Sequence, residues 1–153
     1  MLIGSSLGGY LAALYAVGHP EIERVVLLAP AFGFAQLWLA ELGPERVGAW
    51  QQAGTLPVFH YAAGHSMELS YRFLEDALEH HPFPDVQQPT LIFHGDQDAT
   101  VPVAQSLAFI EHHPHARLVR LPSGHELTDV LDVIWPEAEK FIFKSNTSAT
   151  ELD

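Results

Sequence analysis

Two short, largely apolar runs limit what this chain can fold into more than any other feature of its sequence. They span residues 25–29 and 89–95, and neither alternates with polar side chains as a half-exposed strand does. Runs of this kind are typical of strands buried on both faces, as in a parallel sheet with helices above and below. A third run, residues 117–121, alternates more and is expected nearer a sheet edge.

Helical patterns separate these runs. Residues 10–17 carry apolar side chains at helical spacing before Gly18, and residues 103–113 do so after Pro102. A very short apolar run at residues 1–4 is expected to form the first strand. Strands and helices that alternate in this way imply an α/β fold with a right-handed, mostly parallel sheet.

A long excursion interrupts the alternation between the first two apolar runs and is too structured for a plain loop. Its expected elements are helices at residues 34–41 and 45–52, a hairpin of residues 56–61 and 66–70, and a helix at residues 71–80. We interpret residues 33–88 as a cap inserted over one edge of the sheet. Residues 1–144 then form one domain, and the polar residues 145–153 are expected to be a disordered tail.

The charge of the chain excludes one large class of partners. Seven Lys and Arg residues against 19 Asp and Glu residues leave a formal net charge of −12, whereas nucleic-acid backbones require clustered positive charge. No apolar stretch reaches the roughly 20 residues of a membrane-spanning helix, and residues 1–4 lack the basic start of a signal peptide. We therefore expect a cytoplasmic protein whose partner is a small molecule.

Histidines gather at residues 80–81 and 112–115. Histidines at helix ends usually complement the helix dipole or face solvent, and no carboxylate stands at a recognisable ligand spacing. The glycine-rich start lacks the G-x-G-x-x-G order of a dinucleotide site. The sequence therefore predicts no metal and no other cofactor.

The first chemical signal is the pentapeptide Gly4-Ser5-Ser6-Leu7-Gly8, which fits G-x-S-x-G between an apolar run and a helix. A tight strand-to-helix turn holds its central residue in a strained conformation, and flanking glycines remove Cβ atoms that would collide. The phase of the glycines selects Ser6 as the nucleophile, not Ser5. An ordinary turn that binds a phosphate, or nothing, has the same pattern.

An acid and a histidine follow later strands. Asp98 comes after the run at residues 89–95, and His125 comes after the run at residues 117–121. Because parallel strands end at one rim, we expect Asp98 to accept a hydrogen bond from the His125 ring near the serine turn. Asp96 is the competing acid, and we expect it to bind backbone N–H groups of its turn.

Taken together, these motifs resemble those of the α/β-hydrolase superfamily, in which the order is Ser, Asp, His. The similarity is greatest to its small bacterial serine esterases, the YqiA-like group, and covers residues 1–144. It implies that Ser6 attacks, that His125 is base and then acid, that Asp98 orients His125, and that the Leu7 N–H binds the oxyanion.

The resemblance covers only the later part of the fold. The strands that usually precede the serine turn are missing, and so is the loop that usually supplies a second oxyanion donor. We therefore expect an N-terminally truncated chain whose first strand lies at an open sheet edge. Such an edge favours self-association.

Three functions remain open. The first is a serine hydrolase that cleaves a carboxylic ester or thioester, the second a hydrolase fragment that cannot assemble its site, and the third a non-catalytic small-molecule-binding module. The aromatic residues of the cap are most simply its own core, with a second role as the lining of an acyl pocket. They are Phe32, Phe34, Trp38, Phe59 and Tyr61.

Overall fold

Two compact units make up the chain. The structure is a computed structural model that describes residues 1–60 and 64–143. The first unit, called the sheet unit below, comprises Met1–Ala31 and the chain from Asp85 onward, and the second, called the hairpin unit, comprises Phe32–Pro84. The predicted tail at residues 145–153 lies outside the described residues.

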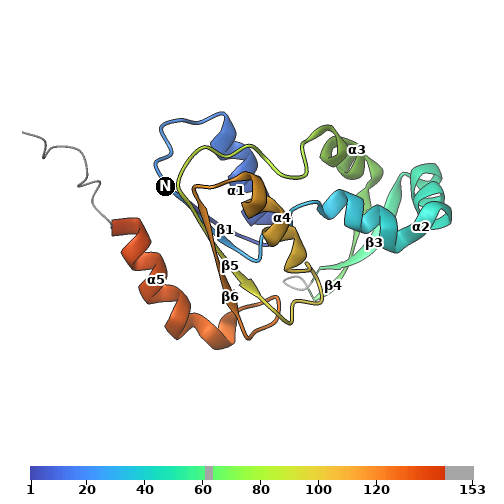
Figure 1. Ribbon diagram of the computed structural model, residues 1–153. Coiled ribbons are helices and arrows are strands. Elements are labelled where there is room, and N and C mark those ends of the chain that lie inside the picture. The colour runs from blue at the N-terminus through green and yellow to red at the C-terminus, as the bar shows by residue number, and fades with distance from the viewer. Residues whose placement is uncertain (61–63, 144–153) are drawn as a thin grey trace, which may run out of the picture. The chain divides into compact units, whose positions relative to one another are not determined.

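Four parallel strands form the centre of the sheet unit (Figure 1). Their order is β1 (Leu2–Ser5), β2 (Val25–Leu28), β5 (Thr90–Gly95) and β6 (Ala116–Leu121). The register aligns Ser5 with Leu28 and Leu28 with Phe93, so the carboxyl ends of β1, β2 and β5 meet at one rim. The predicted α/β class with a mostly parallel sheet is confirmed.

The burial of each strand follows its place in the sheet. Every residue of β5 is buried, and three of the four residues of β2 are buried as well. β1 and β6 are the two edges, and each contains exposed residues. The apolar runs therefore distinguish central strands from edge strands, because a central strand has helices on both faces.

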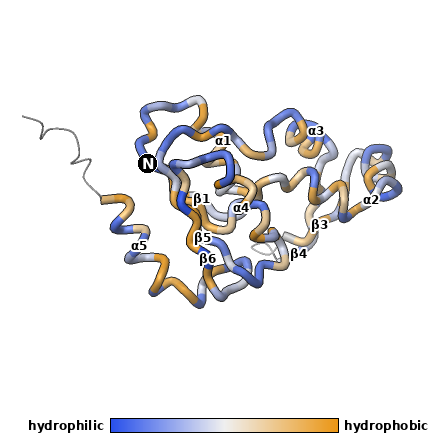
Figure 2. The backbone as a smooth tube through the Cα atoms, in the orientation of Figure 1, coloured by the Kyte–Doolittle hydropathy of each residue, from blue (hydrophilic) through white to orange (hydrophobic). Residues whose placement is uncertain are grey.

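The described residues of the sheet unit form three α-helices: α1 (Leu7–Val17), α4 (Ala104–His112) and α5 (Leu131–Phe143), the last preceded by a 3-10 turn at Thr128–Val130. Ile134 and Ala138 of α5 pack against Val26, Leu91 and Phe93 of the sheet. Hydrophobic and hydrophilic stretches alternate along α5 in Figure 2, as expected for a helix with one buried face. The sequence patterns did not predict α5.

The hairpin unit consists of α2 (Phe34–Ala53), β3 (Thr55–His60), β4 (His65–Ser70) and α3 (Tyr71–Glu79). β3 and β4 are antiparallel. Gly43, with φ 72° and ψ 165°, interrupts α2 just before Pro44, and proline disfavours the helical conformation in the residue before it. The two predicted helices are thus the two halves of α2.

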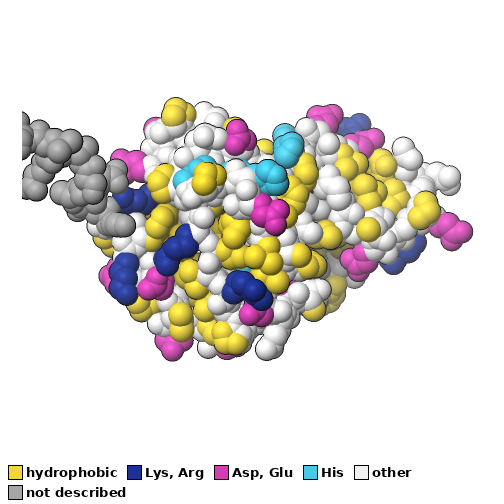
Figure 3. All heavy atoms as spheres, viewed as in Figure 1, with side chains coloured by type: hydrophobic (Ala, Val, Ile, Leu, Met, Phe, Trp, Pro, Cys, Tyr) yellow, Lys and Arg dark blue, Asp and Glu magenta, His cyan; other side chains and the backbone are white. Residues whose placement is uncertain are grey.

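Positive side chains do not gather on the surface seen in Figure 3. Lys and Arg lie there as separate groups among acidic, apolar and uncharged residues. Within the described part of the chain, no helix combines the length and the apolar character needed to cross a membrane.

Candidate active site

Ser6 occupies the turn between β1, which ends at Ser5, and α1, which begins at Leu7. Its backbone has φ 52° and ψ −124°, a region that residues with side chains rarely adopt. The Ser6 carbonyl accepts an N–H from Ala31 at 3.0 Å, which ties the turn to the chain beyond β2. The structure thus places Ser6, and not Ser5, at the strained position of the turn.

The glycines of the turn differ in what they permit. A Cβ atom on Gly4 would lie 2.3 Å from the Gly8 carbonyl oxygen, so only glycine fits there. A Cβ on Gly8 would meet nothing within 4 Å, whereas one on Gly9 would lie 3.2 Å from Pro30. The prediction that both flanking glycines prevent a collision is therefore wrong for Gly8, because its Cα–H points into open space.

Asp98 lies in the loop after β5, and its side chain is fully buried. Its Oδ1 accepts the backbone N–H groups of Thr100 at 2.9 Å and Val101 at 2.8 Å. Asp96, in contrast, is exposed and accepts a bond from Arg120 Nε at 2.7 Å. The prediction for Asp96 is thus wrong: Asp98 is the acid that holds the turn amides, because its carboxylate points into the loop.

His125 joins the acid to the serine. Its Nδ1 lies 2.7 Å from Asp98 Oδ2, and its Nε2 lies 2.9 Å from Ser6 Oγ. Because a carboxylate only accepts hydrogen bonds, these partners assign the proton to Nδ1 and leave Nε2 free to accept from the Ser6 hydroxyl. Three side chains from distant parts of the sequence therefore form one hydrogen-bonded row, as the sequence predicts.

Close backbone approach brings the His125 loop to β5. A Cβ on Gly95 would lie 2.2 Å from the Ser123 carbonyl oxygen, and the Gln97 N–H donates to that same oxygen at 3.0 Å. The Ser123 hydroxyl donates to the Asp129 carboxylate. Sequence reasoning gave none of these residues a role, although a glycine at the end of a buried strand is a recognised sign of close backbone approach.

The Leu7 N–H is the first amide of α1. Amides at a helix start have no acceptor inside the helix, and the helix dipole favours negative charge beside them. Further along α1, burial raises the pKa of the Tyr10 phenol above its usual value, so this ring adds no charge to the helix at neutral pH. The arrangement suits an amide that donates to a developing oxyanion near Ser6.

The predicted pocket aromatics belong to the hairpin unit. Phe34 and Trp38 have ring centroids 6.2 Å apart, and Trp38 lies 6.4 Å from Trp50. Phe32 is fully buried and lies 6.0 Å from Phe83, whereas Phe59 is 55% exposed. Tyr61 lies outside the described residues. Phe34 and Trp38 thus help to build the core of the hairpin unit, which is the simpler of their two expected roles.

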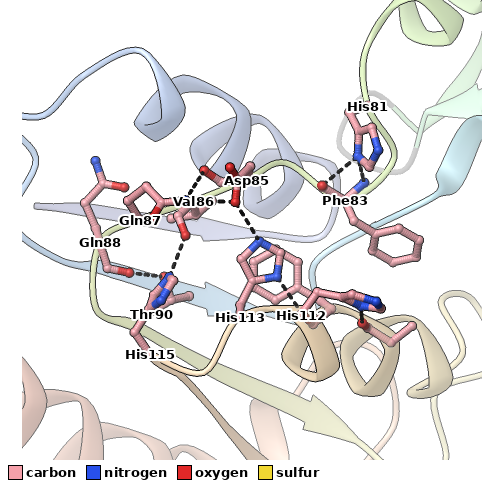
Figure 4. Close-up of polar contacts among 12 residues, drawn as sticks. His81, Phe83, Asp85, Val86, Gln87, Gln88, Thr90, His112, His113 and His115 are labelled. Atoms are coloured by element: carbon pink, nitrogen blue, oxygen red, sulfur yellow. Dashed lines mark hydrogen bonds and ion pairs between the residues drawn. The ribbon is translucent and has the colours of Figure 1, made fainter.

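The histidines after α4 are not surface groups. His113 is 4% exposed, stacks on Phe109 and donates from Nδ1 to the Phe109 carbonyl at 2.7 Å. Figure 4 shows its ring directed toward Asp85, while His115 contacts the Val86 carbonyl. Of the two expected roles, His113 does not face solvent, and its bond to the Phe109 carbonyl places it on a carbonyl group at the C-terminal end of α4, as the helix dipole favours. Across residues 1–60 and 64–143, no three His, Asp or Glu side chains are placed to share a metal ion.

Known proteins give two kinds of match. The profile of an uncharacterised protein family (UPF0227) matches residues 1–141. No curated protein sequence matches significantly. Several similar solved structures carry the names of hydrolases or esterases.

Alpha/beta hydrolase domain-containing protein 10 from mouse has a TM-score of 0.76 at 22% identity, over 94% of this chain and 62% of that one. Est1E from Butyrivibrio proteoclasticus has a TM-score of 0.77 at 22% identity, over 93% of this chain and 59% of that one. Another structure of Est1E contains ferulic acid. The esterase domain of a Rhodothermus marinus protein has a TM-score of 0.58 at 20% identity, over 88% of this chain and 56% of that one. This chain thus spans about three fifths of the length of these proteins and shares their fold.

Proposed function

The chain belongs to the uncharacterised protein family UPF0227, and we propose that it is a serine hydrolase that cleaves a carboxylic ester or thioester through an acyl-enzyme intermediate. One observation carries the proposal. Ser6, His125 and Asp98 form a continuous hydrogen-bonded row, and its serine occupies a strained strand-to-helix turn. Such a row is the arrangement that activates a serine hydroxyl.

The reaction begins when Ser6 Oγ attacks the substrate carbonyl carbon. Its proton passes to His125 Nε2, 2.9 Å away, and the carbonyl oxygen becomes an oxyanion. The Leu7 N–H donates to this oxyanion at the start of α1. When the tetrahedral intermediate collapses, the C–O or C–S bond breaks and His125 returns the proton to the leaving alcohol or thiol.

Hydrolysis of the acyl-enzyme reverses these roles. His125 Nε2 removes a proton from a water molecule, the resulting hydroxide attacks the acyl carbon, and the proton then returns to Ser6 Oγ as the acid leaves. Asp98 keeps the His125 ring in one tautomer and stabilises the imidazolium that forms in each half-reaction. The two backbone N–H groups on Asp98 Oδ1 keep its other oxygen directed at His125.

The substrate side of the proposal rests on the aromatic residues of the hairpin unit. We propose that the aromatic side chains of this unit, among them Phe34, Trp38 and Phe59, bind the acyl group of the substrate, because aromatic side chains suit an apolar acyl group. Est1E, which binds ferulic acid in one of its structures, supports adding an aryl ester to the substrates tested. A small acyl substrate is therefore the expected partner.

A fluorophosphonate probe tests the proposal directly. It forms a P–O bond to an activated serine with loss of fluoride, so the native chain should be labelled at Ser6 and a Ser6→Ala variant should not. Hydrolysis of p-nitrophenyl butyrate, a butyryl thioester and methyl ferulate then identifies the bond that is cleaved. Labelling at Ser5 would contradict the proposal. So would labelling that is the same in the native chain and in Ser6→Ala.

One observation favours the second candidate, a hydrolase whose site is poorly assembled and turns over little. β1, the strand that leads to Ser6, lies at the edge of the sheet, and Ile3 on it is 52% exposed. Loss of one oxyanion donor costs about 10²–10³-fold in turnover. Slow labelling that still requires Ser6, with little hydrolysis, would identify this candidate.

The exposed edge predicts self-association. Size-exclusion chromatography should show oligomers of the native chain, because an edge strand with apolar side chains pairs readily. Ile3→Lys should shift the protein toward the monomer, since a charge blocks edge pairing. Leu11→Lys on α1, which is 51% exposed and lies off the strand edge, is the matched control. A monodisperse monomer of the native chain would contradict this expectation.

A further inference from the structure

We propose that His94 and Ser106 are positioning residues that hold Asp98 in place for His125. The inference deepens the proposed function and rests on it. His94 stands in β5 and Ser106 in α4, and both residues are fully buried. Buried polar side chains are retained only where hydrogen bonds compensate for the loss of water. Both ring nitrogens of His94 have such partners.

The contacts of His94 lead from α4 to the acid loop. Its Nδ1 lies 2.7 Å from Ser106 Oγ, and its Nε2 lies 2.9 Å from the Val101 carbonyl oxygen. The same Nε2 lies 3.3 Å from Asp98 Oδ2. The His94 ring therefore reaches both the backbone of the acid loop and the carboxylate that it carries.

These partners also assign the proton of His94. The Val101 carbonyl only accepts hydrogen bonds, so the proton lies on Nε2, and Nδ1 accepts from the Ser106 hydroxyl. The Val101 carbonyl thereby selects the tautomer whose N–H points at the acid loop. The Ser106 hydroxyl donates to the opposite nitrogen and so holds the His94 ring from the side of α4.

Together the contacts form a cradle around one carboxylate. Both backbone groups of Val101 take part: its N–H donates to Asp98 Oδ1 at 2.8 Å, and its carbonyl accepts a hydrogen bond from His94. Asp98 Oδ2 lies between two imidazoles, with His125 Nδ1 at 2.7 Å and His94 Nε2 at 3.3 Å. Without His94, the Val101 carbonyl would be left unpaired and the carboxylate could turn away from His125.

His94 takes no part in the chemistry itself. Its ring is fully buried and contacts Ser106, Val101 and Asp98, so it acts on the reaction through Asp98. Loss of His94 should therefore lower kcat and leave KM unchanged. A shift of a reacting group by about 1 Å lowers turnover by about 100-fold.

Two substitutions at His94 test the role. His94→Leu removes the donor, and we expect kcat and the rate of fluorophosphonate labelling to fall about 10–100-fold with KM within about twofold. His94→Gln can still present an N–H near the position of Nε2, and should recover much of the loss. Ile134→Val, a core change in α5 of the same unit, is the control for a general loss of stability.

Ser106→Ala provides a milder test if His94→Leu does not fold. It removes one hydroxyl, and we expect kcat to fall about 3–10-fold with KM unchanged, because His94 Nδ1 loses the bond that holds the ring in place. Proton NMR gives a readout that does not depend on turnover. The native chain should show a strongly downfield proton for the His125 Nδ1–H bonded to Asp98, and Ser106→Ala should shift or broaden it.

The two proposals fail in different ways. A native chain that is not labelled at Ser6 would overturn the proposed function, while the NMR signal would still report whether His94 and Ser106 position Asp98. Native-like labelling, kcat and NMR signal in both His94→Leu and Ser106→Ala would overturn the positioning role alone. The positioning role would also be overturned if the His94 and Ser106 variants lost no more kcat than Ile134→Val at the same stability.

Discussion

Two Ser–His pairs meet at one carboxylate in this protein. At the rim of the sheet, His125 connects Asp98 to Ser6, with 2.9 Å between Nε2 and Oγ. Inside the unit, His94 lies between Asp98 and Ser106, with 2.7 Å between Nδ1 and Oγ. Residue types and distances are almost the same in the two pairs.

The two pairs differ in the backbone conformation of their serine and in how far solvent reaches that serine. Ser6 has φ 52°, follows an edge strand and is half-buried. Ser106 is inside the helix α4 and is fully buried. A nucleophile must reach a substrate and must have its hydroxyl directed at the base, and only Ser6 combines the two. Matching residue types alone therefore does not identify the reactive serine.

The largest expected effect separates the two serines. Ser6→Ala should abolish labelling and lower turnover by about 10⁴–10⁶-fold, as for nucleophiles of other serine hydrolases. Ser106→Ala should still be labelled, because its loss leaves Ser6 and His125 in contact. Probe labelling followed by mass spectrometry of the modified peptide measures both. A modified peptide that contains Ser106 would break the comparison.

A second prediction concerns how the outer pair acts as a unit. The double variant Ser6→Ala/His125→Ala should be scarcely less active than either single variant, since each member is ineffective without the other. The measurement is kcat/KM for p-nitrophenyl butyrate in the two single variants and the double variant. Losses that multiply would show that the two residues act independently.

The third prediction tests the strain of the outer serine turn. Gly4→Ala should lower the free energy of unfolding by about 3 kcal/mol, because its Cβ would collide with the Gly8 carbonyl. Gly8→Ala should leave stability the same or raise it by about 0.5 kcal/mol, as expected for alanine in a helix. Urea denaturation compares the two variants. Equal effects would indicate a turn looser than described.

The smallest effects on activity are expected from substitutions next to Ser6 and Asp98 but outside the hydrogen-bonded row. Ser5→Ala and Asp96→Asn should keep most of the activity, since neither side chain belongs to either pair. The exposed pair of Asp96 with Arg120 should contribute at most about 1 kcal/mol to stability. Steady-state kinetics and thermal unfolding of both variants measure this. Inactivation by Ser5→Ala would show that the phase of the motif had been misassigned.

Local patterns predicted most of the elements and failed where a single residue obscured the pattern. The unbroken runs identified β2 and β5, and Gly43 next to Pro44 divides α2 where a helix boundary was expected. α5 was missed because Pro136 interrupts its sequence, and proline usually ends or bends a helix. Packing of Ile134 and Ala138 on the sheet stabilises the helix in spite of it.

The sequence alone determined the fold class and which residues form the outer row. Strand ends of a parallel sheet lie at one rim, so Ser6, Asp98 and His125 could be brought together by topology without knowledge of any contact. The inner pair depended on tertiary structure. His94 and Ser106 are 12 residues apart, one on a strand and the other on a helix. Only the packing of α4 beside β5 brings their side chains together and places the His94 ring next to Asp98. Burial of polar groups depends on neighbours from the whole unit, which no local pattern in the sequence records.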